Sequence, residues 1–465
     1  MPPARPNIVL ILVDDLGWRD VGCYGSAFYE TPHLDRLAAQ GMRFTDAYAA
    51  APVCSPTRAS LLTGRYPARL GLTNYIGGSG RGRLLDAPYI DHLPAEETSL
   101  AQALRDAGYA TWHVGKWHLG QRASYPDRHG FDVNIGGSAW GHPRHGYWSP
   151  WGIETLPDGP AGSYLTDHLT DQAIRLVRGH RDGQPFFLNL WHYAVHTPIQ
   201  APEHLVAKYQ AKARRLGLDR LAVLEEGEPF PCEHKRQQRV VRRRLQSDPV
   251  YAAMVENLDA NVGRLLQALE ETRQARRTIV IFTSDNGGLA TAEGSPTCNA
   301  PLAEGKGWTY DGGVREPLLV RWPGVVRAGA VSEVPITSPD LYPTLLEAAG
   351  LPPRPEQHLD GLSLWPLLRG RGLLPERAIF WHYPHYGNQG GTPASAIRLG
   401  EHKLIEFFED GRRELYNLRR DISEAHNLFG AEPELADSLG AMLERWRQSV
   451  EARIPAPNPA YLVSG

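Results

Sequence analysis

Four short apolar runs, separated by longer amphipathic segments, set the strongest limit on the fold of this chain. Each run is apolar along nearly its whole length, which is typical of a strand covered on both faces. Strands of this kind that alternate with helices predict an α/β fold with a largely parallel sheet. The runs cover residues 7–13, 110–114, 186–191 and 278–283. The predicted helices include residues 98–107, capped by Thr98, residues 250–271, and a segment that begins at Ser338-Pro339 and ends at Gly350.

The pattern changes after the proline-rich segment 352–355. Short strands are predicted at residues 378–382, 394–399 and 402–408, and a last helix at residues 433–450. Strands that follow one another without intervening helices indicate an antiparallel sheet. We therefore expect a catalytic α/β domain of residues 1–368 and a smaller C-terminal subdomain of residues 369–465, with one helix covering its sheet.

Residues 208–246 look like an insertion into the α/β pattern. An acidic patch precedes a basic run; the residues are Glu225, Glu226 and Glu228, then Lys235, Arg236, Arg239, Arg242, Arg243 and Arg244. Such charge striping is typical of a solvated surface helix. The alternative is a segment that contacts substrate or a neighbouring subunit.

Composition and charge exclude several classes of function. The 465 residues include 49 Lys and Arg against 52 Asp and Glu, so the formal net charge of −3 does not indicate nucleic acid or an anionic membrane as a partner. No stretch of about 18 apolar residues is present, which excludes a transmembrane helix. An anionic substrate would have to be attracted by a local cluster of cations.

The N-terminus and the cysteines indicate a reducing compartment. Residues 1–6 lead directly into the first predicted strand, and no small-residue cleavage site follows, so a secretory signal is not expected. The four cysteines, Cys23, Cys54, Cys232 and Cys298, lie far apart and lack metal or redox spacing. We expect free thiols, with a disulfide as the alternative, and a cytoplasmic location.

Two polar pairs stand at the ends of predicted strands. Asp14-Asp15 follows residues 7–13, and Asp285-Asn286 comes just after residues 278–283. In open α/β sheets, ligands bind at the carboxyl ends of the strands. Three carboxylates and an amide gathered there would require a cation, and all-oxygen ligands select Ca²⁺ or Mg²⁺ over zinc. Helix capping is the alternative for either pair alone.

The run Cys54-Ser55-Pro56-Thr57-Arg58 is predicted to open a short helix that Gly64 closes. Cys54 then lies at the helix N-terminus, where the N–H groups and the dipole favour an anion. Arg58 returns to the same face one turn later and can bind a carboxylate, phosphate or sulfate. These residues indicate an activated thiol beside a cation, with a buried structural cysteine as the alternative.

Further cations and imidazoles follow other predicted strands. Lys116 and His118 come after residues 110–114, His192 and His196 after residues 186–191, and Lys306 lies between glycines beyond Asp285-Asn286. Each of them alone is typical of a surface or packing residue. A pocket for a tetrahedral oxyanion ester is predicted from five of these residues together, namely Arg58, Lys116, Lys306, His118 and His196. No glycine-rich phosphate loop precedes a lysine with nucleotide-binding spacing, which argues against a nucleotide hydrolase.

At these positions the chain resembles the type I sulfatases of the alkaline phosphatase superfamily. The signature-like segments are Cys54-Ser55-Pro56-Thr57-Arg58 with Leu61-Leu62-Thr63-Gly64-Arg65, and Gly115-Lys116-Trp117-His118-Leu119-Gly120. Residues 7–15, 283–288 and 312–317 match as well, so the resemblance spans nearly the whole chain. It implies an alkaline-phosphatase-like fold, arylsulfatase-like hydrolysis of sulfuric esters, and oxidation of Cys54 to Cα-formylglycine by a formylglycine-generating enzyme.

The resemblance also implies a role for each candidate residue. Ca²⁺, with Mg²⁺ as a substitute, would be bound by Asp14, Asp15, Asp285, Asn286 and an oxygen of the modified Cys54. One hydroxyl of the hydrated formylglycine would attack sulfur, and the second would let sulfate leave without attack by water. This diol would be held by Arg58, Lys116 and His118. Lys306 would bind sulfate, and His196 would protonate the leaving alcohol. His192 has no matching role and is interpreted as structural.

Two loops are candidates for binding the rest of the substrate. His142 and Arg144 lie in an aromatic and basic loop, and His385 and Asn388 lie at a glycine-rich loop of the C-terminal subdomain. Such residues suit stacking on, and hydrogen bonding to, a sugar ring, with ordinary loop packing as the alternative. Residues 391–418 also resemble carbohydrate-directed bacterial sulfatases, so we expect a small sulfated sugar as substrate and a bacterial source. Trp140 stands where family members often have a small polar residue, and no role is carried over there.

Two other functions remain open at this stage. A phosphonate monoester hydrolase or phosphodiesterase of the same superfamily can use the same modified cysteine. A non-catalytic protein that binds sulfated glycans would keep the pocket and lack the modification. Neither the particular sugar nor the oligomeric state follows from the sequence.

Overall fold

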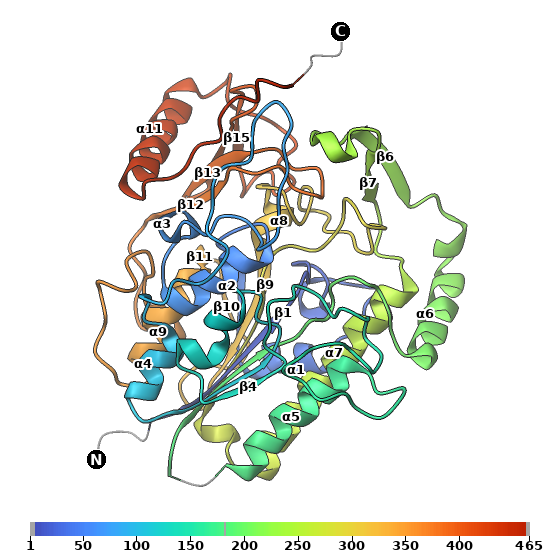
Figure 1. Ribbon diagram of the computed structural model, residues 1–465, viewed down its shortest axis with the longest axis vertical. Helices are drawn as coiled ribbons and strands as arrows, with labels where there is room; N and C mark the ends of the chain where they lie inside the picture. The colour runs from blue at the N-terminus through green and yellow to red at the C-terminus, as the bar shows by residue number, and fades with distance from the viewer. Residues whose placement is uncertain (1–4, 181–182, 462–465) are drawn as a thin grey trace.

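The computed structural model describes residues 5–180 and 183–461, and within them the centre of the fold is a nine-stranded sheet (Figure 1). The strand order is β10-β2-β9-β8-β1-β5-β3-β4, with β11 paired to β2. The strands are β1 (Asn7–Val13), β2 (Met42–Tyr48), β3 (Ala110–Gly115), β4 (Val133–Ile135), β5 (Phe186–Trp191), β8 (Thr278–Ser284), β9 (Arg315–Arg321), β10 (Ala330–Ser332) and β11 (Ile336–Thr337). Only β9 is antiparallel to its described neighbours. The four predicted strands are confirmed as β1, β3, β5 and β8.

Helices cover both faces of this sheet, as predicted (Figure 1). Successive residues of β1 point to opposite faces, so Ile8 and Leu10 belong to one apolar core and Val9 and Ile11 to the other. The first core includes residues of α2 (Cys54–Thr63), α4 (Leu100–Asp106) and α9 (Leu341–Ala348). The second includes residues of α1 (Pro32–Gln40), α5 (Leu165–Gly179), α6 (Glu203–Leu216) and α7 (Pro249–Glu271). Burial on both faces explains why β1 is apolar from Ile8 to Val13.

The predicted helix boundaries agree with the structure to within a few residues. One cap is corrected: α4 is capped by Ser99, whose hydroxyl accepts a hydrogen bond from the Gln102 N–H, and not by Thr98. The Thr98 N–H instead donates to the side chain of Gln357, which holds Thr98 outside the helix. The segment that opens at Ser338-Pro339 forms a short 3₁₀ turn and continues as α9, which ends just before Gly350.

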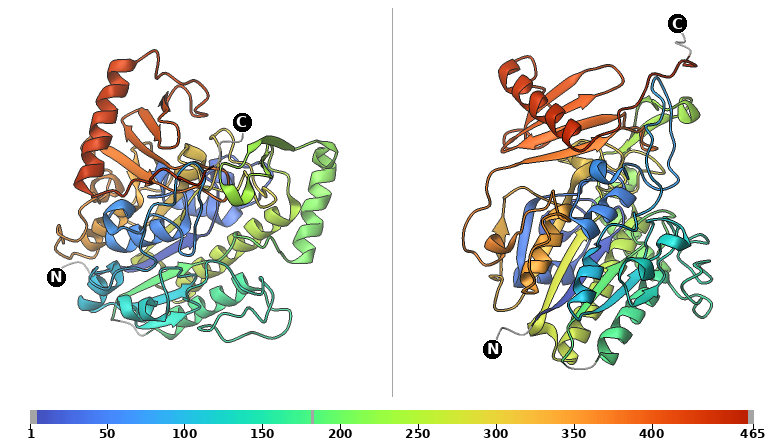
Figure 2. Two further views of the ribbon diagram at one scale, coloured as in Figure 1. Left: turned by 45° about the horizontal axis from the view of Figure 1, so that its top comes forward. Right: turned by 60° about the vertical axis from the view of Figure 1, so that its left-hand side comes forward.

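The C-terminal part contains the predicted antiparallel sheet (Figure 2). Its strands are β12 (Ala378–Tyr383), β13 (Ala394–Leu399), β14 (His402–Phe407) and β15 (Arg413–Asn417), and α11 (Pro433–Ser449) covers it. β15 was not predicted because only Leu415 and Tyr416 are apolar in it; its pairing with β14 defines it as a strand. The predicted combination of a mostly parallel α/β sheet and a smaller antiparallel sheet with one helix is confirmed.

The insertion at residues 208–246 differs from the prediction. α6 ends before Gly217, and the charged residues beyond it form a hairpin of β6 (Leu224–Pro229) and β7 (Arg239–Arg243) instead of a surface helix (Figure 2). Opposite charges pair within the hairpin, since Arg242 binds Glu228 at 2.8 Å. The N–H groups of Val241 and Arg243 also donate to backbone carbonyls of residues 291 and 290. These backbone partners lie far away in the sequence, so the charge pattern alone did not reveal the strand.

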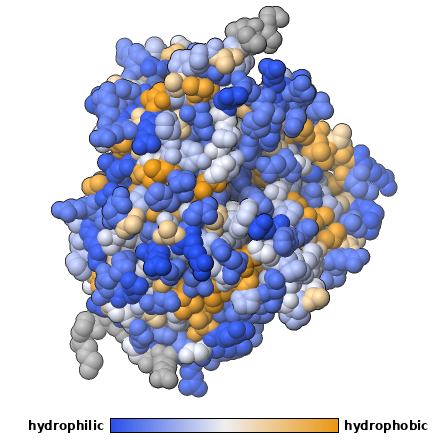
Figure 3. All heavy atoms as spheres, in the orientation of Figure 1, coloured by the Kyte–Doolittle hydropathy of each residue, from blue (hydrophilic) through white to orange (hydrophobic). Residues whose placement is uncertain are grey.

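No helix within the described residues is both long and apolar enough to cross a membrane. The face drawn in Figure 3 is largely hydrophilic, with hydrophobic residues in small scattered groups. All four cysteines are free thiols, as predicted. Residues 1–4, on which the expectation about a secretory signal partly depends, lie outside the described residues.

Candidate active site

The carboxyl ends of β1 and β8 bring the two polar pairs together. These strands are adjacent and parallel, with Val13 beside Ser284, so Asp14-Asp15 emerges next to Asp285-Asn286. All four polar side chains are buried. The Asn286 amide donates to Asp15 Oδ1 at 2.8 Å, and the Asp15 N–H donates to Asp285 Oδ1 at 3.2 Å. The structure thus places the two pairs in direct contact.

Three buried cations face the three carboxylates of this cluster. The pairs are Lys116 Nζ with Asp14 Oδ2 at 2.5 Å, Lys306 Nζ with Asp15 Oδ2 at 2.7 Å, and Arg58 Nη2 with Asp285 Oδ2 at 2.7 Å. Charges removed from water are tolerated when they are paired in this way. The three cations that the sequence placed at this edge of the sheet are therefore all present there.

The acidic residues have the features of a cation site. Asp14 Oδ1 and Asn286 Oδ1 are buried and have no hydrogen-bond partner among the described residues, although buried oxygens normally have one. Ligand atoms of Asp14, Cys54 and Asp285 all lie within 4.8 Å of one another. Burial raises the pKa of Asp14 to about 8 despite the adjacent Lys116. Further positive charge would keep this carboxyl ionised at neutral pH, so the oxygen-rich donor set fits a hard divalent cation.

Cys54 begins α2 as predicted, and Gly64 closes the helix in the left-handed conformation with φ 69°. The Sγ atom of Cys54 lies 3.4 Å from His118 Nδ1. Burial raises the pKa of the Cys54 thiol, although Lys116 and Lys306 act in the opposite direction. The encoded thiol is therefore held in its protonated form, which differs from the activated thiol that the helix position indicated.

The segment after β3 brings Lys116 and His118 to the site. Gly115 has φ 106°, and a Cβ on it would lie 1.9 Å from the carbonyl oxygen of Trp191, so only glycine fits where the chain leaves the strand. His118 has φ 56°, which is uncommon for a residue with a side chain. Its Nε2 lies 3.1 Å from the carbonyl oxygen of Ile76. Burial, and then the charge of Lys116, lower the pKa of His118 well below its usual value and leave the imidazole neutral.

The two histidines that follow β5 lie in different places. His196 lies beside Asp15 of the cluster, and His192 lies outside the cluster. His196 Nε2 lies 3.6 Å from Asp15 Oδ2, and its side chain is 14% exposed. The ring stacks on His142 at 6.4 Å between centroids. The second imidazole, that of His192, is buried, and neither of its ring nitrogens has a hydrogen-bond partner among the described residues.

The four predicted substrate-binding residues occupy different environments. His142 and Arg144 are both exposed; the His142 ring lies on that of His196, and the Arg144 guanidinium lies 4.3 Å from the centre of the Trp140 ring. Asn388 is half-buried and lines a cavity. The fourth residue, His385, is fully buried.

The ring nitrogens of His385 are both occupied. They lie 2.8 Å from Thr73 Oγ1 and 2.5 Å from Asp86 Oδ1. Because neither nitrogen is available to a ligand, His385 anchors the loop of residues 73–86, and the structure does not bring it to a substrate-binding surface.

Two residues that were not predicted from the sequence, Tyr75 and Ile76, form part of the wall of the site. The Ile76 N–H donates to Ser55 Oγ at 3.1 Å, and its carbonyl contacts His118. Both residues lie in the glycine-rich segment 71–82. That glycine content, which allows close approach of a loop, is the one signal that pointed to them.

Comparison with known proteins agrees with this arrangement. A family model described as "Sulfatase" matches residues 6–351, and one described as "N-sulphoglucosamine sulphohydrolase, C-terminal" matches residues 305–449. N-acetylgalactosamine-6-sulfatase of Homo sapiens is 32% identical, over 98% of this chain and 87% of its own length. Arylsulfatase A of Homo sapiens is 35% identical, over 93% of this chain and 86% of its own length.

The fold of this chain is also similar to that of a solved structure. The crystal structure of Ps i-CgsB in complex with k-i-k-neocarrahexaose has a TM-score of 0.74 and 30% sequence identity, and the match covers 95% of this chain and 92% of that one. The family model and the relatives agree over nearly the whole length. The chain therefore belongs to the sulfatase family of the alkaline phosphatase superfamily and is a sulfuric ester hydrolase.

Proposed function

We propose that this sulfatase removes sulfate from a carbohydrate and uses Ca²⁺ and a Cα-formylglycine made from Cys54. The observation that carries the proposal is the buried cluster in which ligand atoms of Cys54, Asp14 and Asp285 lie within 4.8 Å of one another, with three cations around them. A sulfate ester is a tetrahedral anion whose oxygens accept charge-assisted hydrogen bonds from Arg and Lys. A formylglycine-generating enzyme is the partner required for maturation.

The two absent groups fit the residues that surround them. Asp14, Asp15, Asp285 and Asn286 would hold Ca²⁺, or Mg²⁺ in its place, through their oxygens. The cation would supply positive charge close to the reacting sulfate. Formylglycine at position 54 would supply, as its hydrate, a hydroxyl nucleophile and a second hydroxyl that allows sulfate to leave.

The neighbouring side chains would orient these groups and move a proton. Arg58, Lys116 and His118 surround position 54 and would hold its hydroxyl groups. Lys306 pairs with Asp15 through one N–H and has further donors for a sulfate oxygen. At the partly exposed side of the cluster, His196 would donate a proton to the leaving alcohol.

Two relatives support a sugar as the substrate. One is named for a sulfated amino sugar, and the other was solved with neocarrahexaose. In this chain Trp140, His142 and Arg144 are exposed. His142 stacks on His196, and Trp140 lies against His142 and Arg144. An aromatic face with polar neighbours suits a sugar ring. We further propose that residues 1–368 form the catalytic domain and residues 369–465 a subdomain that completes it; the cytoplasmic location stays a prediction.

The reaction class is tested by comparing two esters of the same phenol. We expect the matured protein to hydrolyse an aryl sulfate with a higher kcat/KM than the matching aryl phosphonate monoester, because the chain belongs to the sulfatase family. The comparison requires initial rates for both esters with one enzyme preparation. A preference for the phosphonate by orders of magnitude would identify a phosphonate monoester hydrolase of the same superfamily instead.

The metal site is tested by Asp285→Ala. This change removes one candidate ligand and leaves the buried Arg58 without its closest carboxylate, so we expect loss of one bound Ca²⁺ per chain together with loss of activity. Metal content after dialysis, measured by mass spectrometry, checks the stoichiometry. Asp437→Ala is the control, because Asp437 is 75% exposed on α11. Unchanged Ca²⁺ content in Asp285→Ala would contradict the assignment.

A further inference from the structure

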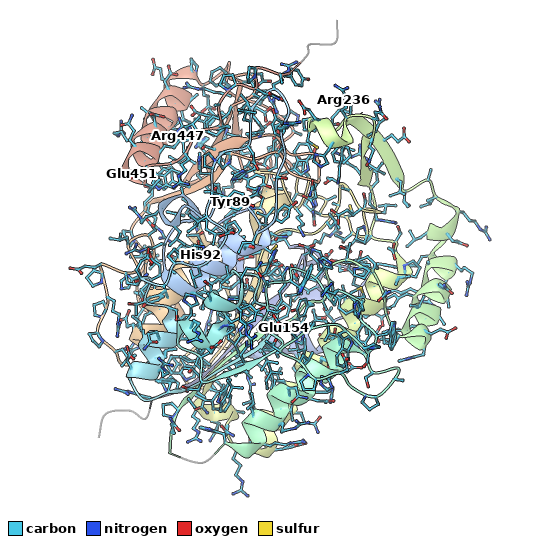
Figure 4. All side chains as sticks on the ribbon, in the orientation of Figure 1. Tyr89, His92, Glu154, Arg236, Arg447 and Glu451 are labelled. Carbon is cyan, nitrogen blue, oxygen red and sulfur yellow. The ribbon has the colours of Figure 1, made fainter. Side chains whose placement is uncertain are left out.

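A cavity of 990 Å³ lies next to the candidate active site. This volume is at the upper end of the range of about 300–1,000 Å³ that is typical of small-molecule sites. Segments far apart in the sequence line it: the loop of residues 75–86, the turn of residues 233–236 between β6 and β7, and Asn388. Figure 4 shows Arg236 at the outer end of the lobe that β6 and β7 form. The insertion of residues 208–246, for which contact with substrate or a neighbouring subunit was the alternative prediction, therefore forms one wall of a cavity.

One wall of the cavity is joined to the groups around Cys54. Cys54 is not itself among the lining residues, but Tyr75 is. The next residue, Ile76, donates its N–H to Ser55 Oγ at 3.1 Å and contacts His118 through its carbonyl. A molecule in the cavity would thus contact Tyr75, and the next residue in the chain, Ile76, contacts Ser55 and His118 beside position 54.

Asn388 ties the walls of the cavity together. Its amide donates to the Tyr75 hydroxyl at 2.5 Å, and its Oδ1 lies 3.1 Å from His234 Nε2. Lys235 Nζ donates to the Asn388 carbonyl at 2.9 Å. The insertion is therefore fixed against the active-site loop through a residue of the C-terminal part, and the cavity has a defined shape.

The charges in the cavity leave one cation unpaired. Glu233 is paired with Arg81 at 2.8 Å, and Asp86 with His385 at 2.5 Å. The exposed side chain of Arg236 has no ion pair or hydrogen bond with any described residue. Glu233 is thus compensated by Arg81, whereas Asp86 is hydrogen-bonded to His385, whose pKa is lowered by burial, and keeps its negative charge. Arg236 supplies positive charge that no ion pair with a described residue offsets.

We propose that this cavity binds the sugar unit adjacent to the one that loses sulfate, and that Arg236 pairs with an anionic substituent, a carboxylate or a second sulfate, on that unit. The inference rests on the proposed carbohydrate sulfatase function. Tyr75 contributes an aromatic side chain to the lining, which suits contact with a sugar ring, and a guanidinium fork fits either anion with two parallel hydrogen bonds. Arg236 would act on binding alone, since no described contact joins its side chain to the groups around Cys54.

The test compares three disaccharides built on one 6-sulfated N-acetylgalactosamine, whose neighbouring sugar is neutral, carboxylated or sulfated. Arg236→Gln is expected to raise KM for the carboxylated or the sulfated disaccharide by about tenfold with kcat unchanged. Which of the two responds identifies the anion. The neutral disaccharide and an aryl sulfate should be unaffected. Arg239→Gln, an exposed arginine of the same hairpin outside the cavity lining, is the matched control.

The outcomes separate this inference from the function on which it rests. An equal loss on the aryl sulfate, no difference between Arg236→Gln and Arg239→Gln, or no cleavage of any disaccharide while the aryl sulfate is cleaved would each overturn the inference. If the matured wild-type protein cleaves no sulfate ester at all, the proposed function fails instead.

Discussion

Replacing Cys54 with alanine is expected to lower kcat/KM for an aryl sulfate by at least about a thousandfold. The loss is large because the proposed nucleophile is made from this side chain, while Lys306 would still bind the sulfate group without anything to attack it. The fold should survive, because Cys54 is a small side chain at the start of α2 and alanine is compatible with a helix. We expect a change in unfolding free energy of only about 1 kcal/mol.

Kinetics and intact mass together check this prediction. Wild-type protein produced with a formylglycine-generating enzyme should be lighter than the encoded chain by about 18 Da, and Cys54→Ala should have its encoded mass. Cys23→Ala makes the same chemical change at a half-buried cysteine and should keep both the mass shift and the activity. Full activity of Cys54→Ala would contradict the mechanism. Unmodified Cys54 in protein from its native host would favour a non-catalytic glycan-binding protein.

The strands that are buried on both faces could be predicted from the sequence. Strands that carry polar residues into the sheet could not. β2 has an arginine and an aspartate within it, so it lacked the continuous apolar pattern. The structure shows why the charge is tolerated: Asp46 is paired with Arg315 at 2.9 Å and with Arg398 at 2.8 Å. These partners are more than 250 residues away in the chain. Such compensation can be seen only after folding.

The same distinction applies to the candidate site. The gathering of Asp14-Asp15 and Asp285-Asn286 was predictable, because parallel strands present their carboxyl ends at one edge. The protonated state of the Cys54 thiol was not, since it depends on how completely separate segments exclude water from it. His385 is a second example: its residue type suits a sugar, but burial with Thr73 and Asp86 occupies both ring nitrogens. Burial, unlike topology, is a property of the packed structure.

Replacing Lys403 with methionine is expected to destabilise the protein by about 3–5 kcal/mol. Lys403 Nζ lies 2.8 Å from Asp311 Oδ1 and 2.9 Å from Glu424 Oε1, and all three side chains are 0% exposed. The contact joins β14 of the C-terminal sheet to α8 (Asp311–Val314), which precedes β9 of the central sheet. Methionine fills a similar volume but leaves two buried carboxylates without the cation between them. Equilibrium unfolding in guanidinium chloride measures the loss.

The pH dependence of this loss identifies its cause. Burial raises the pKa of Glu424 to about 7, and Lys403 opposes that rise, so the variant should have a still higher Glu424 pKa. An acid whose pKa is higher in the folded than in the unfolded state loses stability as pH rises, because the folded state must release a proton that it binds more tightly. The deficit of Lys403→Met should therefore be larger at about pH 8 than at about pH 5.

Two further variants separate lost charge from lost packing. Adding Glu424→Gln to Lys403→Met removes one stranded carboxylate and keeps an oxygen that can accept the Asp311 N–H, so it should recover part of the stability. Arg419→Met is the control, because Arg419 is 72% exposed and its pairing with Glu401 at 3.0 Å is a surface contact, worth at most about 1 kcal/mol. The deficit in Lys403→Met could instead be independent of pH and unchanged by Glu424→Gln. That result would show that packing of the lysine stem, and not its charge, holds the C-terminal sheet against the central sheet.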